Sequence, residues 1–458
     1  MRSRKAEIVQ SVHAIPTVAF DDAKRLTSFS GLVLFQALFQ ALELPRRLRK
    51  CFGHLGRGRV FGLARVVLQL IVHTILGFRR LRDRDYYADD PLVCRILGVV
   101  KLPDVATISR TIAAADAKSV MNLRGLLRDL VLDRLAAAGL ARATIDFDGS
   151  VLSTTRRAEG SAVGYNPKRK GARSYYPLFA VVSQLGMFFD LLHRPGNTHD
   201  SRGATTFIAE CIETLRGRLG RMVVEARLDS AFFDESVLET LERLRVEYAA
   251  AVPFSRFTRL RYLVDRRERW RRIDADWSFF ELQWRPKSWS DNRRLIVVRR
   301  RKRVRTKGPL QLDLFEPLEL EFEYKVIVTN KTAGAASVIA FFNGRGIQEQ
   351  IFGEAKQDAS LGYVPCKRLV ANQIFVLSTM LAHNLGRELQ LRAEPIRRRT
   401  TPTRAPMFAL RSLGTIRDQL VRRAGALTRP QGRLCLNVAA PPRARAEFGE
   451  LLEHLQAA

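Results

Sequence analysis

The sequence predicts an α/β fold in which a mixed β-sheet carries packed helices, a β-rich insertion interrupts the sheet domain, and an all-helical region comes first. Three observations predict this fold. Over the first 140 residues, apolar positions recur at helical spacing. From Ala143 to Asp148, apolar and polar residues alternate as they do in a half-buried strand. The patterns that follow run in the order β-β-β-α-β-α-β, which is typical of a mixed sheet with helices on its faces.

The N-terminal region is predicted to be helical. Its periodic segments are Phe29–Leu44, Val60–Phe78 and Lys118–Ala138. Between them Pro103 breaks the pattern, and Asp104 or Thr107 is suited to cap a new helix that carries Ser109 and Arg110. A helix, a short turn and a second helix with a polar face resemble a helix-turn-helix DNA reader, although most such pairs only pack together.

The sheet domain is predicted from short segments of alternating type. After the first strand, Tyr175–Gln184 and Met187–Leu192 form a hairpin across Leu185-Gly186. The next segments alternate between helix and strand, and they are Thr205–Leu219, Arg221–Leu228, Val237–Leu244 and Tyr248–Val252.

The last third of the chain begins with the insertion. It holds all four tryptophans and a nearly all-cationic run, Arg299–Gly308, and it is followed by a strand at Phe322–Thr329. Helices are then expected at Ala335–Lys356 and Ile374–Leu391, before an Arg/Pro-rich tail that is poorly periodic until Phe408–Val421. The predicted regions are therefore a helical one at 1–140, the sheet domain at 141–254 and 322–392, the insertion at 255–321, and a basic tail at 393–458.

The charge of the chain favours a polyanionic partner. Among 458 residues, 77 are Lys or Arg and 46 are Asp or Glu, so the formal net charge is +31. This balance indicates nucleic acid or an anionic membrane surface. Because the basic residues are spread over the whole length, they suit a long channel for a nucleic-acid backbone better than a peripheral anchor.

Other features of the composition exclude some classes of protein. The five cysteines are far apart and form no CxxC or Cys/His cluster, which argues against a zinc site or a disulfide framework and fits a reducing cytosol. The first residues lack an apolar signal core. The apolar stretches Leu32–Leu44 and Val66–Phe78 are too short to span a membrane, so no membrane partner is expected.

Three acidic residues lie at positions suited to catalysis. Asp148 and Asp229 each end a predicted strand, and Glu349 lies on the helix after the insertion. At about 100° per residue, Arg345 and Lys356 share one helix face with Glu349. Carboxylates that converge at one sheet edge would bind hard divalent ions such as Mg²⁺, and two such ions can activate the attacking oxygen and stabilise the leaving oxygen at phosphorus. The flanking cations can then hold a DNA backbone.

The same residues also have a purely structural interpretation. A row of Arg, Glu and Lys on a helix is often a solvated salt-bridge face, and aspartates after strands are ordinary turn residues. Asp146 lies two residues before Asp148 on the same strand face, so it remains the alternative first ligand. Glu354 lies roughly 140° from Glu349 around the helix and should face elsewhere.

The motifs around these acidic residues resemble the bacterial insertion-sequence transposases of the DDE class. The first motif is Asp148-Gly149-Ser150, and the second is Asp229-Ser230-Ala231-Phe232-Phe233, where the family often has Asp-Ser-Gly-Phe-Phe. The family signature Y-x2-R-x3-E-x6-K falls on Phe342, Arg345, Glu349 and Lys356. Phe342 lacks the tyrosine hydroxyl, which puts one phosphate contact in doubt but not the metal site. Two further segments are similar to members of this group, Gly164–Lys168 and Arg194–His199.

The resemblance covers about 143–390 and implies a ribonuclease-H-like catalytic core with Asp148, Asp229 and Glu349 as catalytic metal ligands. It further implies two Mg²⁺ or Mn²⁺ ions and cut-and-paste transposition by cleavage and strand transfer, with a hairpin intermediate in some relatives. The implied partners are terminal inverted repeats, target DNA and a second copy in a dimeric synaptic complex, at the nucleoid in a bacterial cytoplasm. Two alternatives stay open: a nuclease without strand transfer, and an inactive DNA-binding protein.

Several residues outside the acidic motifs are candidates for DNA contact. Trp284 and Trp289 could stack on a flipped base, or they could pack the core of the insertion. His199 could lie near the site, or it could be an ordinary surface residue. The cationic run could bind DNA or form a solvated loop, and its candidate residues are Arg300, Arg301, Lys302 and Arg303.

Overall fold

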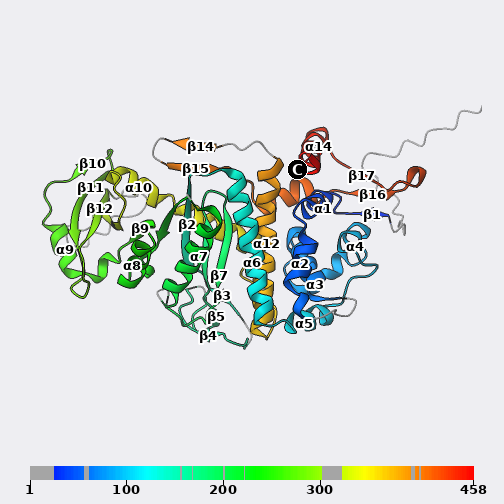
Figure 1. Ribbon diagram of the computed structural model, residues 1–458, viewed down its shortest axis with the longest axis horizontal. Helices are drawn as coiled ribbons and strands as arrows, with labels where there is room; N and C mark the ends of the chain where they lie inside the picture. The colour runs from blue at the N-terminus through cyan, green and yellow to red at the C-terminus, as the bar shows by residue number, and fades with distance from the viewer. Residues whose placement is uncertain are drawn as a thin grey trace, which may run out of the picture.

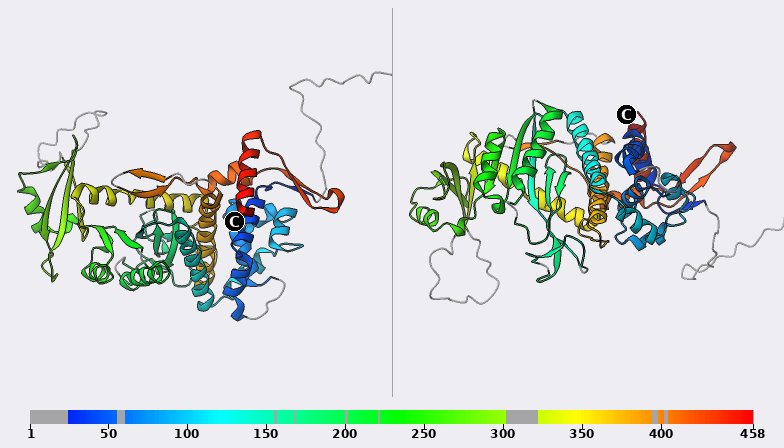
Figure 2. Two further views of the ribbon diagram at one scale, coloured as in Figure 1. Left: turned by 45° about the horizontal axis from the view of Figure 1, so that its top comes forward. Right: turned by 60° about the horizontal axis from the view of Figure 1, so that its bottom comes forward.

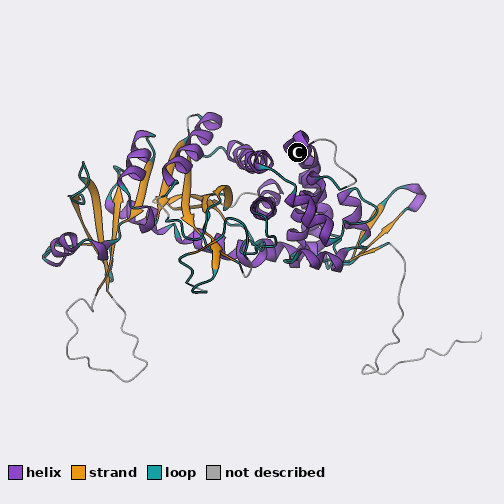
Figure 3. Ribbon diagram, turned by 90° about the horizontal axis from the view of Figure 1, so that it is seen from below, coloured by secondary structure: helices purple, strands orange, loops and turns teal. Residues whose placement is uncertain are grey.

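The computed structural model describes residues 25–55, 61–154, 157–167, 169–199, 202–220, 222–301, 322–393, 398–401 and 404–457. The molecule is elongated, with the strands of the insertion at one end and the N-terminal helices at the other (Figure 1). Seen from below, most strands lie in one half with helices among them, and helices dominate the other half beside one projecting hairpin (Figure 3). Within the described ranges, every helix is too short or too polar to span a lipid bilayer.

The N-terminal region is a bundle of helices, and its longest member, α6, also packs against the sheet. The helices are α1 (Leu32–Ala41), α2 (Leu44–Cys51), α3 (Leu63–Leu76), α4 (Pro91–Leu97), α5 (Val105–Ala113) and α6 (Ala117–Ala138). The predicted helix at Phe29–Leu44 differs, because α1 ends at Ala41 and Glu43, with φ of +49°, turns the chain into α2. Asp104 caps α5 by accepting a hydrogen bond from the Thr107 backbone N–H at 2.6 Å.

The central sheet has the strand order and directions of a ribonuclease-H-like fold. Its strands are β2 (Arg142–Gly149), β6 (Leu178–Val182), β7 (Met187–Leu192), β8 (Val223–Leu228) and β9 (Glu247–Ala251). They lie in the order β7-β6-β2-β8-β9. β2 is antiparallel to β6 and parallel to β8, and β8 is parallel to β9. The predicted mixed sheet is therefore present.

The insertion extends this sheet. Its strands are β10 (Arg271–Arg272), β11 (Trp277–Trp284) and β12 (Arg293–Arg301), which continue through β13 (Phe322–Thr329) to β9. A short helix, α9 (Thr258–Asp265), precedes them. Buried residues of β11 and β12 belong to the same apolar core as β2 and β8. The β-rich character was predicted, but the continuity with the central sheet was not.

Side chains on β6 alternate between two cores, as the pleat of a strand requires. Ala180 points to the core formed with α7 (Ala204–Leu219) and α8 (Glu235–Arg243). Phe179 and Val181 point to the opposite core, which contains α11 (Gly346–Asp358), α12 (Leu369–Ala393) and the N-terminal helices. The helical region and the sheet domain thus share one continuous core on this side.

The helix predicted at Ala335–Lys356 is broken in two. α10 (Ala335–Asn343) ends before Gly344, and α11 begins at Gly346. The backbone at Gly344 and Arg345 keeps helical torsion angles, yet Arg345 donates its N–H to Phe342 only three residues back. This tighter turn separates the apolar α10 from the helix that carries Glu349.

The C-terminal segment was predicted as an Arg/Pro-rich tail with little periodicity, yet it contains several short strands and helices. It forms β14 (Arg398–Thr401), β15 (Arg404–Phe408), α13 (Leu413–Ile416), β16 (Gly425–Thr428), β17 (Cys435–Val438) and α14 (Pro442–Ala457). β16 pairs with β1 (Leu26–Thr27) near the start of the chain, and the β16–β17 hairpin projects from the body (Figure 2). Leu451 and Leu455 of α14 are buried in the N-terminal core. A second small sheet consists of β3 (Leu152–Ser153), β4 (Ala162–Val163) and β5 (Arg173–Tyr175).

Candidate active site

Strand register brings the first two acidic residues together. β2 and β8 are parallel, and Phe147 pairs with Leu228 near the carboxyl end of both strands. Asp148 directly follows Phe147 and Asp229 directly follows Leu228, so the two aspartates lie at the same edge of the sheet. Their side chains are 20% and 30% exposed, which leaves both carboxylates accessible to a ligand.

A single guanidinium lies between these two carboxylates. Nη2 of Arg345 is 3.1 Å from Oδ2 of Asp148 and 3.7 Å from Oδ2 of Asp229. The other carboxylate oxygen of Asp229 accepts a hydrogen bond from the Ala231 backbone N–H at 2.9 Å, which fixes the turn of the second motif. Two negative charges are thus held around one positive group, as in a site for a cation.

Asp146 has a different environment from Asp148. Its side chain is fully buried and receives two hydrogen bonds from Arg227, at 2.6 and 2.7 Å. The same guanidinium donates to the Ser183 hydroxyl at 2.5 Å. Because its oxygens already bind a neighbouring arginine and no solvent reaches them, Asp146 is less suited than Asp148 to hold a metal ion.

The Asp146–Arg227 pair also supports the break between α10 and α11. Nη1 of Arg227 donates to the Phe341 carbonyl at 3.0 Å, and the guanidinium lies 5.4 Å from the centroid of the Phe341 ring. A Cβ atom on Gly344 would lie 2.3 Å from Nη1 of Arg227. Because Gly344 has no side chain, the turn between α10 and α11 can pack directly against the buried guanidinium of Arg227.

The structure does not bring Glu349 into the same cluster. Glu349 lies in the first turn of α11 and is exposed. Among the residues that the structure describes, no group of three or more carboxylate, His or Cys side chains is placed to hold a metal ion. The neighbouring Gln348 is fully buried, and its amide has no hydrogen-bond partner within the described part of the chain. Only two of the three expected ligands are thus brought together here.

The other cationic candidates lie on two elements. Lys356 is half-buried in the last turn of α11. Arg300 and Arg301 are exposed at the end of β12, with the Arg300 guanidinium 5.4 Å from the centroid of the Trp277 ring. Lys302 and Arg303 lie outside the described residues.

The two tryptophans have different surroundings. Trp284 is buried against Phe257, with ring centroids 5.2 Å apart, so its ring is used in packing. Trp289 is half-buried and stacks on Phe233 of the second acidic motif at 4.5 Å and 27°. The guanidinium carbon of Arg293, on β12, lies 5.2 Å from the centroid of the Trp289 ring. The insertion therefore contacts the motif of Asp229 through Trp289.

The two other family-like segments also meet in space. A Cβ atom on Gly164 would lie 1.9 Å from the Gly196 carbonyl oxygen, so the two backbones touch where neither carries a side chain. Arg194 is buried and donates to the carbonyls of Tyr176, His199 and Arg202. The His199 side chain is exposed.

Sequence reasoning missed two residues of this site. Arg227 lies opposite Asp146 in the register of β2 and β8. The sequence feature that could have revealed it is a single arginine within an otherwise largely apolar strand. Lys325 of β13 lies 5.3 Å from the centroid of the Phe342 ring, and its Nζ is 3.3 Å from the Asn343 side-chain oxygen. Burial and the charge of Arg345 lower the pKa of Lys325, while Glu349 raises it. β13 thus supplies a cation beside the broken helix.

The donor chemistry of the site fits a hard divalent cation. Asp148 and Asp229 offer oxygen ligands at one partly exposed edge. The guanidinium of Arg345 marks a position where both carboxylates stabilise a positive charge. Mg²⁺ and Mn²⁺ prefer such oxygen donors.

Comparison with known proteins identifies relatives of the chain. The family model for the transposase DDE domain, group 1, matches residues 10–458. A search of curated proteins finds no match.

Solved transposases show a weak structural likeness. The piggyBac transposase, in a synaptic complex with hairpin DNA, is 11% identical over 94% of this chain and 82% of that chain, with a TM-score of 0.42. The Mos1 transposase, in a paired-end complex with the left transposon end, is 11% identical over 40% of this chain and 57% of that chain, with a TM-score of 0.19. The ribonuclease-H-like assignment therefore depends on the strand order and directions described above.

Proposed function

Because the chain belongs to the DDE transposase family whose model matches nearly all of it, we propose that it cleaves and joins DNA at the inverted-repeat ends of a mobile element. The observation that carries this proposal is the pair Asp148 and Asp229, which share one guanidinium at the carboxyl edge of two parallel strands. We assign these two residues, with Glu349, as the catalytic metal ligands.

The metal ions would supply the phosphoryl-transfer chemistry: two Mg²⁺ or Mn²⁺ ions activate the attacking oxygen and stabilise the leaving one. The residues of the chain prepare the site for them. Asp148 and Asp229 provide oxygen donors, and Arg345 offsets their mutual repulsion before a metal binds. Once released from the carboxylates, Arg345 can pair with a DNA phosphate, and Lys356 in the last turn of α11 is the second candidate for a phosphate contact.

For Glu349 to act together with the two aspartates, its side chain or α11 itself has to shift toward them. The tight turn at Gly344 and Arg345 offers a hinge for such a movement. The buried Gln348 amide, which finds no partner within the described residues, makes the present position of α11 costly. We infer that DNA and metal binding together favour a second position of this helix.

The proposed partners follow from the charge and from the family. A formal net charge of +31 suits DNA as the partner. We propose that the substrate is a terminal inverted repeat, that the second substrate is target DNA, and that two copies of the chain hold two ends in a synaptic complex. We place this activity at the nucleoid of a bacterial cytoplasm.

Strand cleavage of the element end in Mg²⁺ tests the proposed site. The Asp229→Ala variant should lose at least about 10³-fold in cleavage rate, because a metal ligand is removed. The matched control is Glu213→Ala, which removes an exposed carboxylate on α7 and should cleave like the unaltered protein. Full activity of Asp229→Ala would rule out this assignment.

A second experiment separates transposition from simple cleavage. A pre-cut element end with a free 3′-hydroxyl is supplied together with target DNA and Mg²⁺. Joining of the two supports transposition, whereas cleavage of uncut ends without any joining indicates a nuclease. Salt-dependent binding without either reaction would indicate an inactive DNA-binding protein.

A further inference from the structure

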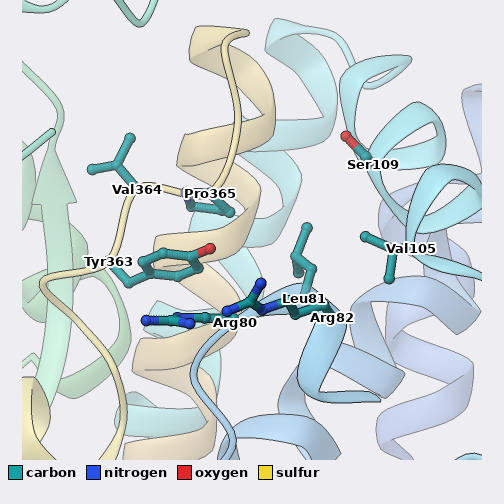
Figure 4. A pocket seen from close by; sticks show the side chains of 8 residues that line it. All are labelled: Arg80, Leu81, Arg82, Val105, Ser109, Tyr363, Val364 and Pro365. Atoms are coloured by element: carbon teal, nitrogen blue, oxygen red, sulfur yellow. The ribbon is translucent and has the colours of Figure 1, made fainter. Parts of the chain in front are cut away.

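An open pocket of about 460 Å³ lies between the N-terminal helices and the segment that follows α11 (Figure 4). One wall comes from the 3₁₀ helix η2 (Leu81–Tyr87) with the residue before it, the second from α5, and the third from residues 363–365. The lining residues are Arg80, Leu81, Arg82, Val105, Ser109, Tyr363, Val364 and Pro365. The lining combines two cations, an aromatic ring and a hydroxyl with apolar side chains, and it contains no carboxylate.

The two pocket arginines are not neutralised by neighbours. Among the residues that the structure describes, Arg80 and Arg82 form no ion pair, and both are exposed. The nearest acidic residue in sequence, Asp83, instead accepts the Arg80 backbone N–H at 2.8 Å. By contrast, Arg124 binds the buried Asp190 at 2.7 and 2.8 Å. The charge in the pocket therefore remains available to an anion.

The aromatic wall is held in a fixed orientation. Tyr363 is half-buried and packs edge-on against Phe375 of α12, with ring centroids 5.7 Å apart. The guanidinium carbon of Arg79 lies 5.7 Å from the centroid of the Tyr363 ring. Figure 4 shows the Arg80 and Arg82 side chains beside this ring and Ser109 on α5 farther away. A flat ring next to guanidiniums that have no acidic partner among the described residues suits a nucleotide, whose base stacks while its phosphate pairs with arginine.

α11 connects the candidate active site to the pocket in the chain, because Arg345 directly precedes it and residues 363–365 follow it. A Cβ atom on Gly362 would lie 3.9 Å from Cγ of Lys356, so the chain that leads to Tyr363 passes beside the last cation of α11. Along α11, Glu349 and Lys356 are separated by about 10 Å, which corresponds to about three nucleotides of one DNA strand. A strand that leaves the catalytic aspartates along α11 would thus arrive at this pocket.

We propose that the pocket binds one unpaired nucleotide of a DNA strand, with its phosphate on Arg80 and Arg82 and its base against Tyr363. This inference rests on the proposed function and adds a site for the DNA outside the catalytic carboxylates. It also gives α5 a role in DNA contact through Val105 and Ser109, which line the pocket on one helix face.

Fluorescence anisotropy with a labelled single-stranded DNA of mixed sequence tests the proposal, in EDTA so that no metal contributes. Arg80→Ala with Arg82→Ala should weaken binding about 10-fold at 0.1 M salt and lower the slope of log K against log salt by about 0.7 to 1.4, for one or two lost phosphate contacts. Arg80→Lys with Arg82→Lys keeps the charge and should retain the slope. The matched control is Arg443→Ala with Arg445→Ala, two exposed arginines of α14, which should change affinity less than about 2-fold.

The aromatic contact is tested separately. Tyr363→Leu should weaken binding about 10-fold without changing the salt slope, since base stacking involves no charge. Ultraviolet irradiation of an oligonucleotide that contains 5-iododeoxyuridine should crosslink to Tyr363, as mapped by mass spectrometry. Thermal unfolding of each variant checks that it is folded.

Several outcomes would overturn the proposal. They are an unchanged salt slope in the folded double-alanine variant, the absence of a crosslink at residues 363–365, and displacement of the oligonucleotide by millimolar deoxyadenosine monophosphate, which would indicate a site for free nucleotides. The Asp229→Ala variant should bind the oligonucleotide normally. Loss of cleavage therefore tests the proposed catalytic site, and loss of oligonucleotide binding tests the proposed pocket.

Discussion

At the scale of single residues, the position of Arg345 is the most informative feature of the site. Its guanidinium reaches Asp148 and Asp229 from the turn between two helices, although 116 residues separate it from Asp229 in the chain. The cation that was expected to bind DNA phosphate instead neutralises the carboxylates that were expected to bind metal. Arg345 therefore competes with any cation for these two carboxylates.

Removal of Arg345 should therefore strengthen metal binding while it weakens catalysis. In Arg345→Ala, the two carboxylates lose a competing cation, so Mn²⁺ should bind about 10-fold more tightly in calorimetric titration. Cleavage of DNA should fall, because a phosphate contact is lost. Weaker Mn²⁺ binding in this variant would show that Arg345 supports the metal site instead of competing for it.

Asp146 and Arg227 form a buried positioning pair beneath the site. Asp146→Asn leaves the guanidinium without its charge partner, so the free energy of unfolding should fall by about 3 kcal/mol. The double variant Asp146→Leu with Arg227→Met should recover most of this loss, but not the cleavage activity, because Phe341 and Gly344 lose their support. Urea unfolding and cleavage of the same samples measure both effects. If Asp146→Asn keeps full stability and abolishes metal binding, Asp146 is a ligand and not a positioning residue.

At the scale of elements, the break between α10 and α11 decides where Glu349 lies. The sequence analysis predicted one helix over Ala335–Lys356 because Arg345, Glu349 and Lys356 are spaced to share one helix face, although Gly344 and Gly346 are poor helix formers. The interruption depends on Arg227, which arrives from a strand more than 100 residues earlier. Asn343, Gly344 and Gly346 mark a weak point in the helix locally, but the contact with Arg227 depends on the tertiary structure.

Gly344→Ala tests this interpretation of the break. The added Cβ would lie 2.3 Å from the Arg227 guanidinium, so stability should fall by about 1 to 3 kcal/mol and cleavage should be reduced. Gly346→Ala is the matched control, since a Cβ there meets no atom within 4 Å. It should leave stability unchanged or slightly raised, as alanine favours a helix over glycine. Equal effects of the two substitutions would show that the Arg227 contact does not matter.

Sequence patterns predicted the strands better than their connections. The alternation in β2 and the apolar run of β8 were sufficient to place Asp148 and Asp229 at strand ends. The pairing of Phe147 with Leu228, which makes them neighbours, depends on tertiary register. Likewise, α14 was not predicted because the C-terminal segment is rich in basic residues. Its apolar residues Leu451 and Leu455 pack into the core formed by the N-terminal helices.

At the scale of the whole molecule, three histidines whose rings are removed from solvent link stability to pH. Burial lowers the pKa of His73 and of His193 to about 4, and that of His383 to about 3. Each of these bases is neutral in the folded protein and takes up a proton near pH 6.5 when the chain unfolds. Their contribution is therefore fully present above about pH 6.5 and is lost as the pH falls from 6.5 toward 4.

Acidification from pH 7 to 5.5 should lower the free energy of unfolding by about 1 kcal/mol for each of these histidines. His193→Leu should remove about one third of this dependence, because its ring nitrogens are buried and have no partner among the described residues. Urea unfolding at several pH values measures the slope. A slope that does not change in His193→Leu would mean that this histidine is not buried in its neutral form.

The whole account depends on one claim, that Asp148 and Asp229 hold a divalent metal. The most direct test replaces Mg²⁺ by Fe²⁺ in the presence of ascorbate and peroxide, so that hydroxyl radicals cut the backbone next to the bound ion. We predict cuts close to residues 148 and 229, with an additional cut near residue 349 when the DNA end is bound, and none in the Asp148→Ala, Asp229→Ala double variant. Cuts elsewhere in the chain, or cuts that persist in the double variant, would contradict the account.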